Sequence, residues 1–180
     1  RKGVFLDPGS QLGRLILAYA SHLADDVDSF REESETALAL NPNSPYTVGA
    51  IGWMLALRGE FERGLPMLDH AIATNPCHPA WFHAGYVIDH LLRRDYETAL
   101  TETRAHRPFM SFWDDVMLAA MLGKTGRIEE ARRHVDRVNE QKPDFAERNR
   151  EMIRRSLKIG AVVDELNDGL RLAGLPVGRS

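Results

Sequence analysis

Apolar residues recur at helical spacing along the chain. In residues 44–58, Val48, Ile51 and Leu55 fall on one helix face, and a second helical face follows Gly59. No segment alternates apolar and polar residues as a half-buried strand does, and β-branched residues are sparse. The pattern therefore predicts an all-α protein whose unit is a helix, a short turn with glycine, and a second helix.

Proline-containing connectors separate these units at a regular interval. Residues 41–45 (Asn-Pro-Asn-Ser-Pro) and 75–79 (Asn-Pro-Cys-His-Pro) are two copies of one connector, 34 residues apart, and Pro143 lies about two periods further on. Proline stops a helix and restricts the residue before it, so each connector predicts a helix boundary. A fixed period of this length is typical of a repeat array.

Within each period, the order of large and small residues resembles the tetratricopeptide repeat. In residues 45–78 its slots hold Val48, Ile51, Gly52, Leu55, Gly64, Leu68, Ala71 and Pro76. In residues 112–145 they hold Asp115, Leu118, Ala119, Leu122, Ala131, Val135, Val138 and Pro143. The resemblance implies a right-handed α-solenoid of antiparallel helix pairs, with a helical C-terminal cap.

These boundaries predict a single domain over residues 1–180. It comprises a degenerate leading pair at 11–42, repeats at 45–78, 79–111 and 112–145, and capping helices at 146–175. One residue departs from the pattern, because Asp115 stands where the family usually has a core-facing aromatic. We expect either a rotated helix there or Val116 in the core position.

Composition narrows the classes of function. The 180 residues are 43% hydrophobic and 27% charged, with a net charge of −3, which disfavours a strongly basic nucleic-acid binder. The lone Cys77 excludes an intrachain disulfide framework. Residues 12–23 form the longest apolar stretch, which is too short to span a bilayer, so we expect no membrane insertion and a cytoplasmic location. Because the chain begins at Arg1 rather than Met, we expect a piece of a longer protein.

Charge is distributed unevenly. Residues 25–35 are acidic, whereas residues 124–158 contain eleven Lys or Arg against seven Asp or Glu. Acidic residues are interleaved in the basic segment, so we interpret it as a solvated face rather than a nucleic-acid surface.

Candidate chemistry is sparse. His83 and His90 lie seven residues apart, whereas metal sites on helices favour spacings of three or four. No catalytic arrangement of residues stands out. We therefore expect no metal, no cofactor and no enzymatic activity.

The first helices of the repeats supply the candidate binding surface. Residues 46–57 contain no charged side chain, and an all-round apolar helix must be buried on two sides or bind something. In the family that the chain resembles, first helices line a concave groove. The predicted groove residues are Tyr46, Trp53, Leu57, Trp81, His83, Val87, His90, Trp113 and Val116.

Residues 168–176 resemble the end of a C-terminal repeat tract found in bacterial cyclase-type or winged-helix regulators. We therefore expect a non-catalytic protein-interaction module, which docks an apolar peptide or helix for a larger signalling protein. The alternatives are a homodimer that buries the same apolar faces and, less favoured, an enzyme of unknown type.

Overall fold

The computed structural model describes residues 9–106 and 112–176, and every regular element in these two ranges is a helix. The helices are α2 (Gln11–Ala24), α3 (Val27–Leu40), α4 (Pro45–Leu57), α5 (Phe61–Thr74), the 3₁₀ helix η1 (Ala80–His83), α6 (Ala84–Leu92), α7 (Tyr96–Ala105), α8 (Phe112–Lys124), α9 (Ile128–Gln141), α10 (Phe145–Ser156) and α11 (Gly160–Leu172). The prediction of an all-α protein is confirmed.

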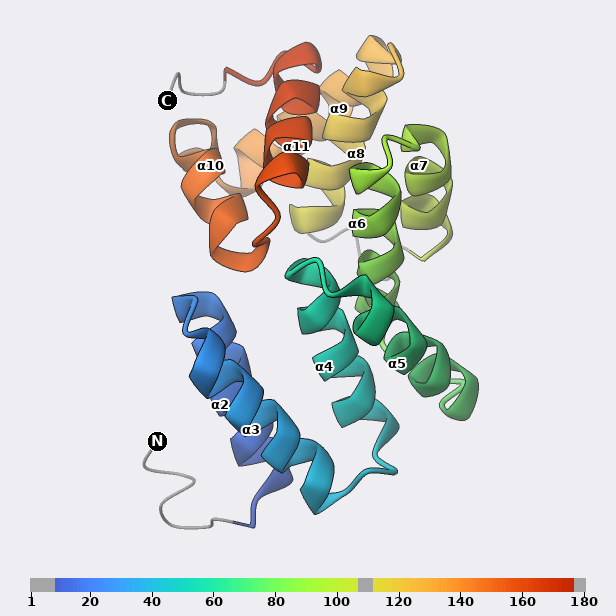
Figure 1. Cartoon of the computed structure of the whole chain (residues 1–180). Helices are drawn as coiled ribbons and strands as arrows, with labels where there is room; N and C mark the ends of the chain where they lie inside the picture. The colour runs from blue at the N-terminus through green and yellow to red at the C-terminus, as the bar shows by residue number, and fades with distance from the viewer. Residues whose placement is uncertain (1–8, 107–111, 177–180) are drawn as a thin grey trace. The chain divides into compact units, whose positions relative to one another are not determined.

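The contacts divide the chain into two compact units, residues 1–85 and 86–180, with the boundary near the start of α6. We call them unit 1 and unit 2 and describe each by itself. In Figure 1, unit 1 runs from blue to green and unit 2 from green to red.

The turns within the first four helix pairs share one hydrogen-bonding pattern. In each, a backbone N–H donates to the carbonyl oxygen five residues earlier: Asp26 to Ser21, Glu60 to Leu55, Asp95 to His90, and Arg127 to Leu122, at 2.9 Å in every case. The preceding residue has a positive φ, as a Schellman helix end requires. Glycine occupies this position at Gly59 and Gly126, as the sequence predicted, while Asp25 and Arg94 adopt the same conformation elsewhere.

The two copies of the proline connector also fold alike. Asn41 and Asn75 each accept, through Oδ1, a hydrogen bond from the backbone N–H two residues later, at 3.2 and 3.1 Å. Their carbonyl oxygens each accept from the N–H three residues later, at 3.3 and 2.9 Å. Equal sequences at equal intervals thus produce equal turns, and the chain has the character of a helical repeat.

In unit 1, α4 is the central helix and packs against α2, α3, α5 and η1. Its crossing with α5 is close because both helices have glycine there: a Cβ added at Gly64 would lie 2.6 Å from the carbonyl oxygen of Gly52. Ser44 caps α4 by accepting from Thr47 N–H, and Pro45 occupies the first turn. Nearly all of α4 is buried, which accounts for the absence of charge in residues 46–57.

In unit 2, α8 packs against α7, α9 and α11. A Cβ added at Gly169 would lie 2.3 Å from the carbonyl oxygen of Ala120, so α8 and α11 meet backbone to backbone. The predicted C-terminal helices are present as α10 and α11, and α11 covers α8 with Val162, Val163, Leu166 and Leu170 buried.

Asp115 is fully buried, and the adjacent Val116 is buried as well. His134 Nδ1 lies 2.7 Å from Asp115 Oδ1, and Gln141 donates to Oδ2 at 3.2 Å. Arg137 Nε lies 3.2 Å from the same carboxylate. Helix α8 can hold Asp115 in the core because side chains of α9 contact its carboxylate.

Candidate functional site: an apolar groove in unit 1

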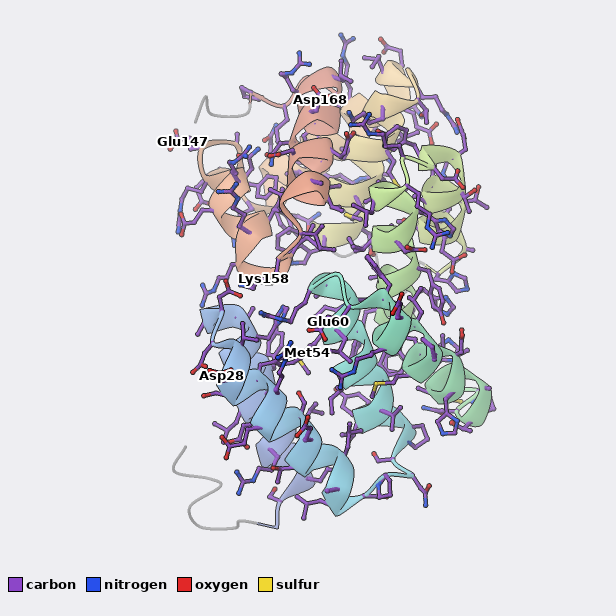
Figure 2. All side chains as sticks on the ribbon, in the orientation of Figure 1. Asp28, Met54, Glu60, Glu147, Lys158 and Asp168 are labelled. Carbon is purple, nitrogen blue, oxygen red and sulfur yellow. The ribbon has the colours of Figure 1, made fainter. Side chains whose placement is uncertain are left out.

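A groove of about 380 Å³ lies between α2 and α4 of unit 1. Its lining is apolar or aromatic throughout and comprises Leu12, Leu15, Ile16, Tyr19, Tyr46, Ala50, Trp53, Met54 and Trp81. Met54, which is labelled in Figure 2, belongs to the α4 wall. No side chain that lines the groove is charged, so an occupant would meet hydrocarbon and aromatic rings.

The α4 wall presents Tyr46, Ala50 and Trp53, which are spaced so that they share one helix face. Trp81, from η1, packs edge-on against Trp53 with ring centroids 5.0 Å apart, and against Tyr46 at 6.2 Å. Tyr19, from α2, approaches Trp53 at 6.1 Å. Four aromatic rings therefore form a continuous surface in the groove.

The α2 wall presents Leu12, Ile16 and Tyr19, again on one helix face. These side chains are 61%, 58% and 40% exposed. Tyr46, on the opposite wall, is also exposed. Within residues 9–85, the large hydrophobic residues left in solvent are thus gathered around this groove, apart from Leu40 at the end of α3.

The indole nitrogen of Trp53 is a polar atom in the α4 wall. This Nε1 atom is buried and finds no hydrogen-bond partner among the described residues. A buried donor without an acceptor destabilises the protein by about 1–3 kcal/mol. The penalty belongs to the fold itself, because an atom that water cannot reach is also out of reach of an occupant of the groove.

The charges nearest in sequence to the groove walls are paired. Arg14, on α2, contacts Glu33 at 2.9 Å, and Arg58, at the end of α4, contacts Asp25 at 3.2 Å. Both arginines are held toward α3 or the turn that precedes it. Neither arginine therefore presents an unpaired charge at the edge of the groove.

The structure brings three of the nine predicted residues together in the groove: Tyr46, Trp53 and Trp81. Leu57 is buried in unit 1, and His83 lies at the end of η1, outside the groove lining. Gly49, three residues after Tyr46 on α4, is covered by Phe82, because a Cβ there would lie 2.1 Å from the Phe82 ring. Part of the predicted surface is thus filled by the chain itself.

The remaining four predicted residues belong to unit 2. Val87 and Val116 are buried. His90 is half-buried, with Nδ1 3.9 Å from Asp95 Oδ2. Trp113 is exposed and packs on Phe112 and Phe145, at centroid distances of 5.2 and 6.3 Å.

Leu12, Leu15, Ile16 and Tyr19 were not predicted as groove residues. The signal was present in the sequence, because Leu12, Ile16 and Tyr19 repeat the spacing of Tyr46, Ala50 and Trp53 one period earlier. The leading pair matches the repeat pattern poorly at its other slots, which obscured this correspondence.

Unit 2 contains a separate, partly buried ionic cluster. Lys124, at the end of α8, lies 2.7 Å from Glu165 and 2.5 Å from Asp168, both on α11. Tyr96, at the start of α7, donates to Glu165 at 2.6 Å. Asp168 is labelled in Figure 2 on α11. The cluster ties three helices together.

The pKa values in this cluster follow from burial and hydrogen bonding. Burial alone raises the pKa of Glu165, but hydrogen bonds from Lys124 and Tyr96, together with the positive charges of Lys124 and Arg94, outweigh burial and hold that pKa below its usual range. For Lys124, burial lowers the pKa, and the two carboxylates more than compensate, so the pKa is raised. The arrangement favours the charged forms of both groups.

None of the described helices combines the length and the apolar character needed to cross a membrane. Comparison of the chain with known protein families and with curated proteins gave no match.

Proposed function

We propose that this chain is a non-catalytic protein-interaction module whose groove between α2 and α4 binds an apolar helix. The observation that carries the proposal is the pair of matching walls. Leu12, Ile16 and Tyr19 face the groove from one helix, and Tyr46, Ala50 and Trp53 face it from the other. Exposed apolar surface concentrated in one concavity is typical of binding sites.

A helix suits this groove better than a charged or extended peptide. Two facing rows of side chains at helical spacing provide ridges between which a third helix can lie. The uncharged lining would leave a buried charge on the occupant without a partner. We therefore expect an amphipathic helix with apolar anchors every three or four residues.

The proposed setting of the module rests on the sequence. The resemblance to the tetratricopeptide repeat supports a right-handed α-solenoid, and the buried pattern positions Ile51, Leu55, Leu68 and Ala71 agree with helix pairs of that kind. The resemblance of residues 168–176 supports a regulatory or docking part of a larger cytoplasmic bacterial signalling protein.

The test selects helical peptides from a displayed library on the whole chain and measures their affinity by fluorescence anisotropy. Ile16→Glu places a charge in the groove at an exposed position, and we expect it to weaken binding about tenfold or more. Ala39→Glu adds the same charge at an exposed position of α3 outside the groove, and we expect unchanged binding.

Selected peptides should share apolar residues at helical spacing. The proposal fails if Ile16→Glu and Ala39→Glu bind these peptides equally well, or if no peptide is enriched over a scrambled library.

The alternative is a homodimer in which the same groove is filled by a second copy of the chain. The same exposed residues of α2 would then be buried between the two copies. The mass of the chain in solution separates the two proposals, as set out in the Discussion.

A further inference from the structure

Outside the groove, two imidazole rings of unit 1 approach each other through their Nε2 atoms. His78 lies in the connector after α5, and His83 ends η1. Their Nε2 atoms are 3.0 Å apart, their ring centroids are 5.1 Å apart, and both side chains are half-buried. Neither residue lines the groove.

The ring of His78 is held in one tautomer. Its Nδ1 lies 3.1 Å from the backbone carbonyl oxygen of Asn75. A carbonyl oxygen can only accept, so Nδ1 carries the proton, and the Nε2 atom of the neutral ring offers a lone pair toward His83. Histidines that bind metals commonly donate their other N–H to a carbonyl in this way.

The surrounding chain restricts movement of the His78 ring. The Asn75 carbonyl also accepts the His78 backbone N–H at 2.9 Å, and Asn75 Oδ1 accepts from Cys77 N–H at 3.1 Å. In the sequence, Phe82 lies between the two histidines. Its side chain is fully buried, and its ring lies nearly parallel to that of His78 at a centroid distance of 6.4 Å. The His78 half of the pair is therefore held in place before any ligand binds.

We propose that His78 and His83 bind a divalent transition metal through their Nε2 atoms, with water completing the coordination. Metal–nitrogen bonds of about 2.0–2.1 Å to two atoms 3.0 Å apart give an angle of about 95° at the metal. This angle is near the right angle of a tetragonal site and below that of a tetrahedral one. The geometry favours Cu²⁺, and then Ni²⁺, over Zn²⁺.

Metal binding changes the protonation of the two imidazole rings. Without metal, the 3.0 Å separation suits a hydrogen bond that the Nε2–H of His83 donates to the lone pair of His78. Metal coordination requires both Nε2 atoms to be unprotonated, so the proton between them is released to solvent. No change in oxidation state is involved.

The proposal is independent of the groove, and its test uses the metal alone. The whole chain is titrated with Cu²⁺ by calorimetry, and the bound ion is examined by electron paramagnetic resonance. We expect one Cu²⁺ site per chain whose spectrum reports two nitrogen ligands. The wild type should bind Cu²⁺ more tightly than Zn²⁺.

His78→Gln and His83→Gln should each weaken Cu²⁺ binding about tenfold or more, while retaining polar side chains of similar size. His70→Gln, at an exposed position of α5, is the matched control, and Cys77→Ser tests the neighbouring thiol. Both should bind as the wild type does. Circular dichroism checks that every variant remains helical.

Two results would overturn the proposal. One is equal Cu²⁺ affinity of the wild type, His78→Gln and His83→Gln. The other is a loss in Cys77→Ser or His70→Gln as large as that in the His78 and His83 variants. A rise in melting temperature with Cu²⁺ in the wild type, absent from His78→Gln, gives an independent readout.

Discussion

Asp115 shows how one residue can break the repeat pattern and remain in the core. An unpaired carboxylate in this position would be strongly destabilising, because burial removes its hydration. Here His134, Arg137 and Gln141 converge on it from α9. The polar group of α8 is thus matched by three polar groups spaced along one face of the partner helix.

We expect Asp115→Ala to lower the free energy of unfolding by about 3 kcal/mol, because it removes the carboxylate that the buried His134 and the half-buried Arg137 contact. Urea unfolding followed by circular dichroism measures the change. Asp136→Ala, at an exposed position of α9, should stay within about 0.5 kcal/mol of the wild type. Equal stability of the Asp115 and Asp136 variants would contradict this account.

At the scale of the element, glycines decide how closely the helices cross. Gly123 and Gly169 allow α8 and α11 to touch through their backbones, and Gly52 and Gly64 do the same for α4 and α5. A methyl group at these crossings would overlap backbone atoms, which cannot move aside as a flexible side chain can. The small residues of the pattern are therefore determinants of helix packing.

Gly169→Ala should lower the free energy of unfolding by about 2–3 kcal/mol, because the new Cβ would lie 2.3 Å from the Ala120 carbonyl oxygen. Gly160→Ala is a matched control on α11, where an added Cβ meets nothing within 4 Å. There the better helix propensity of alanine should leave stability unchanged or raise it by up to about 1 kcal/mol. Thermal unfolding of the two variants compares them, and similar losses in both would refute the crossing argument.

The ionic cluster between α7, α8 and α11 makes a prediction about pH. The pKa of Glu165 lies below its ordinary value of 4.5, so its ionised form stabilises the folded state. This contribution is fully present above about pH 4.5 and is lost as the pH falls through the lowered pKa. Lys124 has a raised pKa, so its contribution is lost only at strongly alkaline pH.

Glu165→Gln should therefore be less stable than the wild type at pH 7, and the difference should shrink on acidification below about pH 4.5. Urea unfolding at pH 7, 5 and 3 measures this trend. Glu140→Gln, at an exposed position of α9, should show no such dependence. A difference for Glu165→Gln that is the same at all three pH values would exclude the electrostatic explanation.

At the scale of the whole molecule, the exposed apolar residues of unit 1 raise the question of self-association. If the groove is a docking site for another protein, the purified chain should scatter light as a 20.3 kDa monomer at all concentrations tested. Leu12 and Ile16 are then simply solvent-exposed in the free protein. If a second copy fills the groove, the mass should double as the concentration rises.

The variant Ile16→Glu distinguishes docking of another protein from self-association. Under the docking proposal, the variant and the wild type should have the same monomeric mass. A wild-type dimer that Ile16→Glu converts to a monomer, while Ala39→Glu does not, would favour self-association and displace the docking proposal.

The sequence by itself determined the all-helical class, the positions of the turns and connectors, and the residues that become core. These properties depend on local chemistry. Proline restricts φ, glycine permits the left-handed helix end, and an apolar stripe at helical spacing must be buried. The pattern positions Val48, Ile51, Leu55, Leu118 and Val138 are accordingly all buried.

The groove could be predicted in part. Tyr46 and Trp53 were recognised because the uncharged run of residues 46–57 exceeds what one core face requires, and Trp81 because it lies in the first helix of the next predicted repeat. Tertiary structure decided the rest. Which apolar side chains are covered depends on neighbours far along the chain, as when Phe82 fills the space beside Gly49 while Ile16 stays exposed. The partners of Asp115 and the approach of His78 to His83 likewise depend on how helices and connectors pack, which spacing in the sequence does not specify.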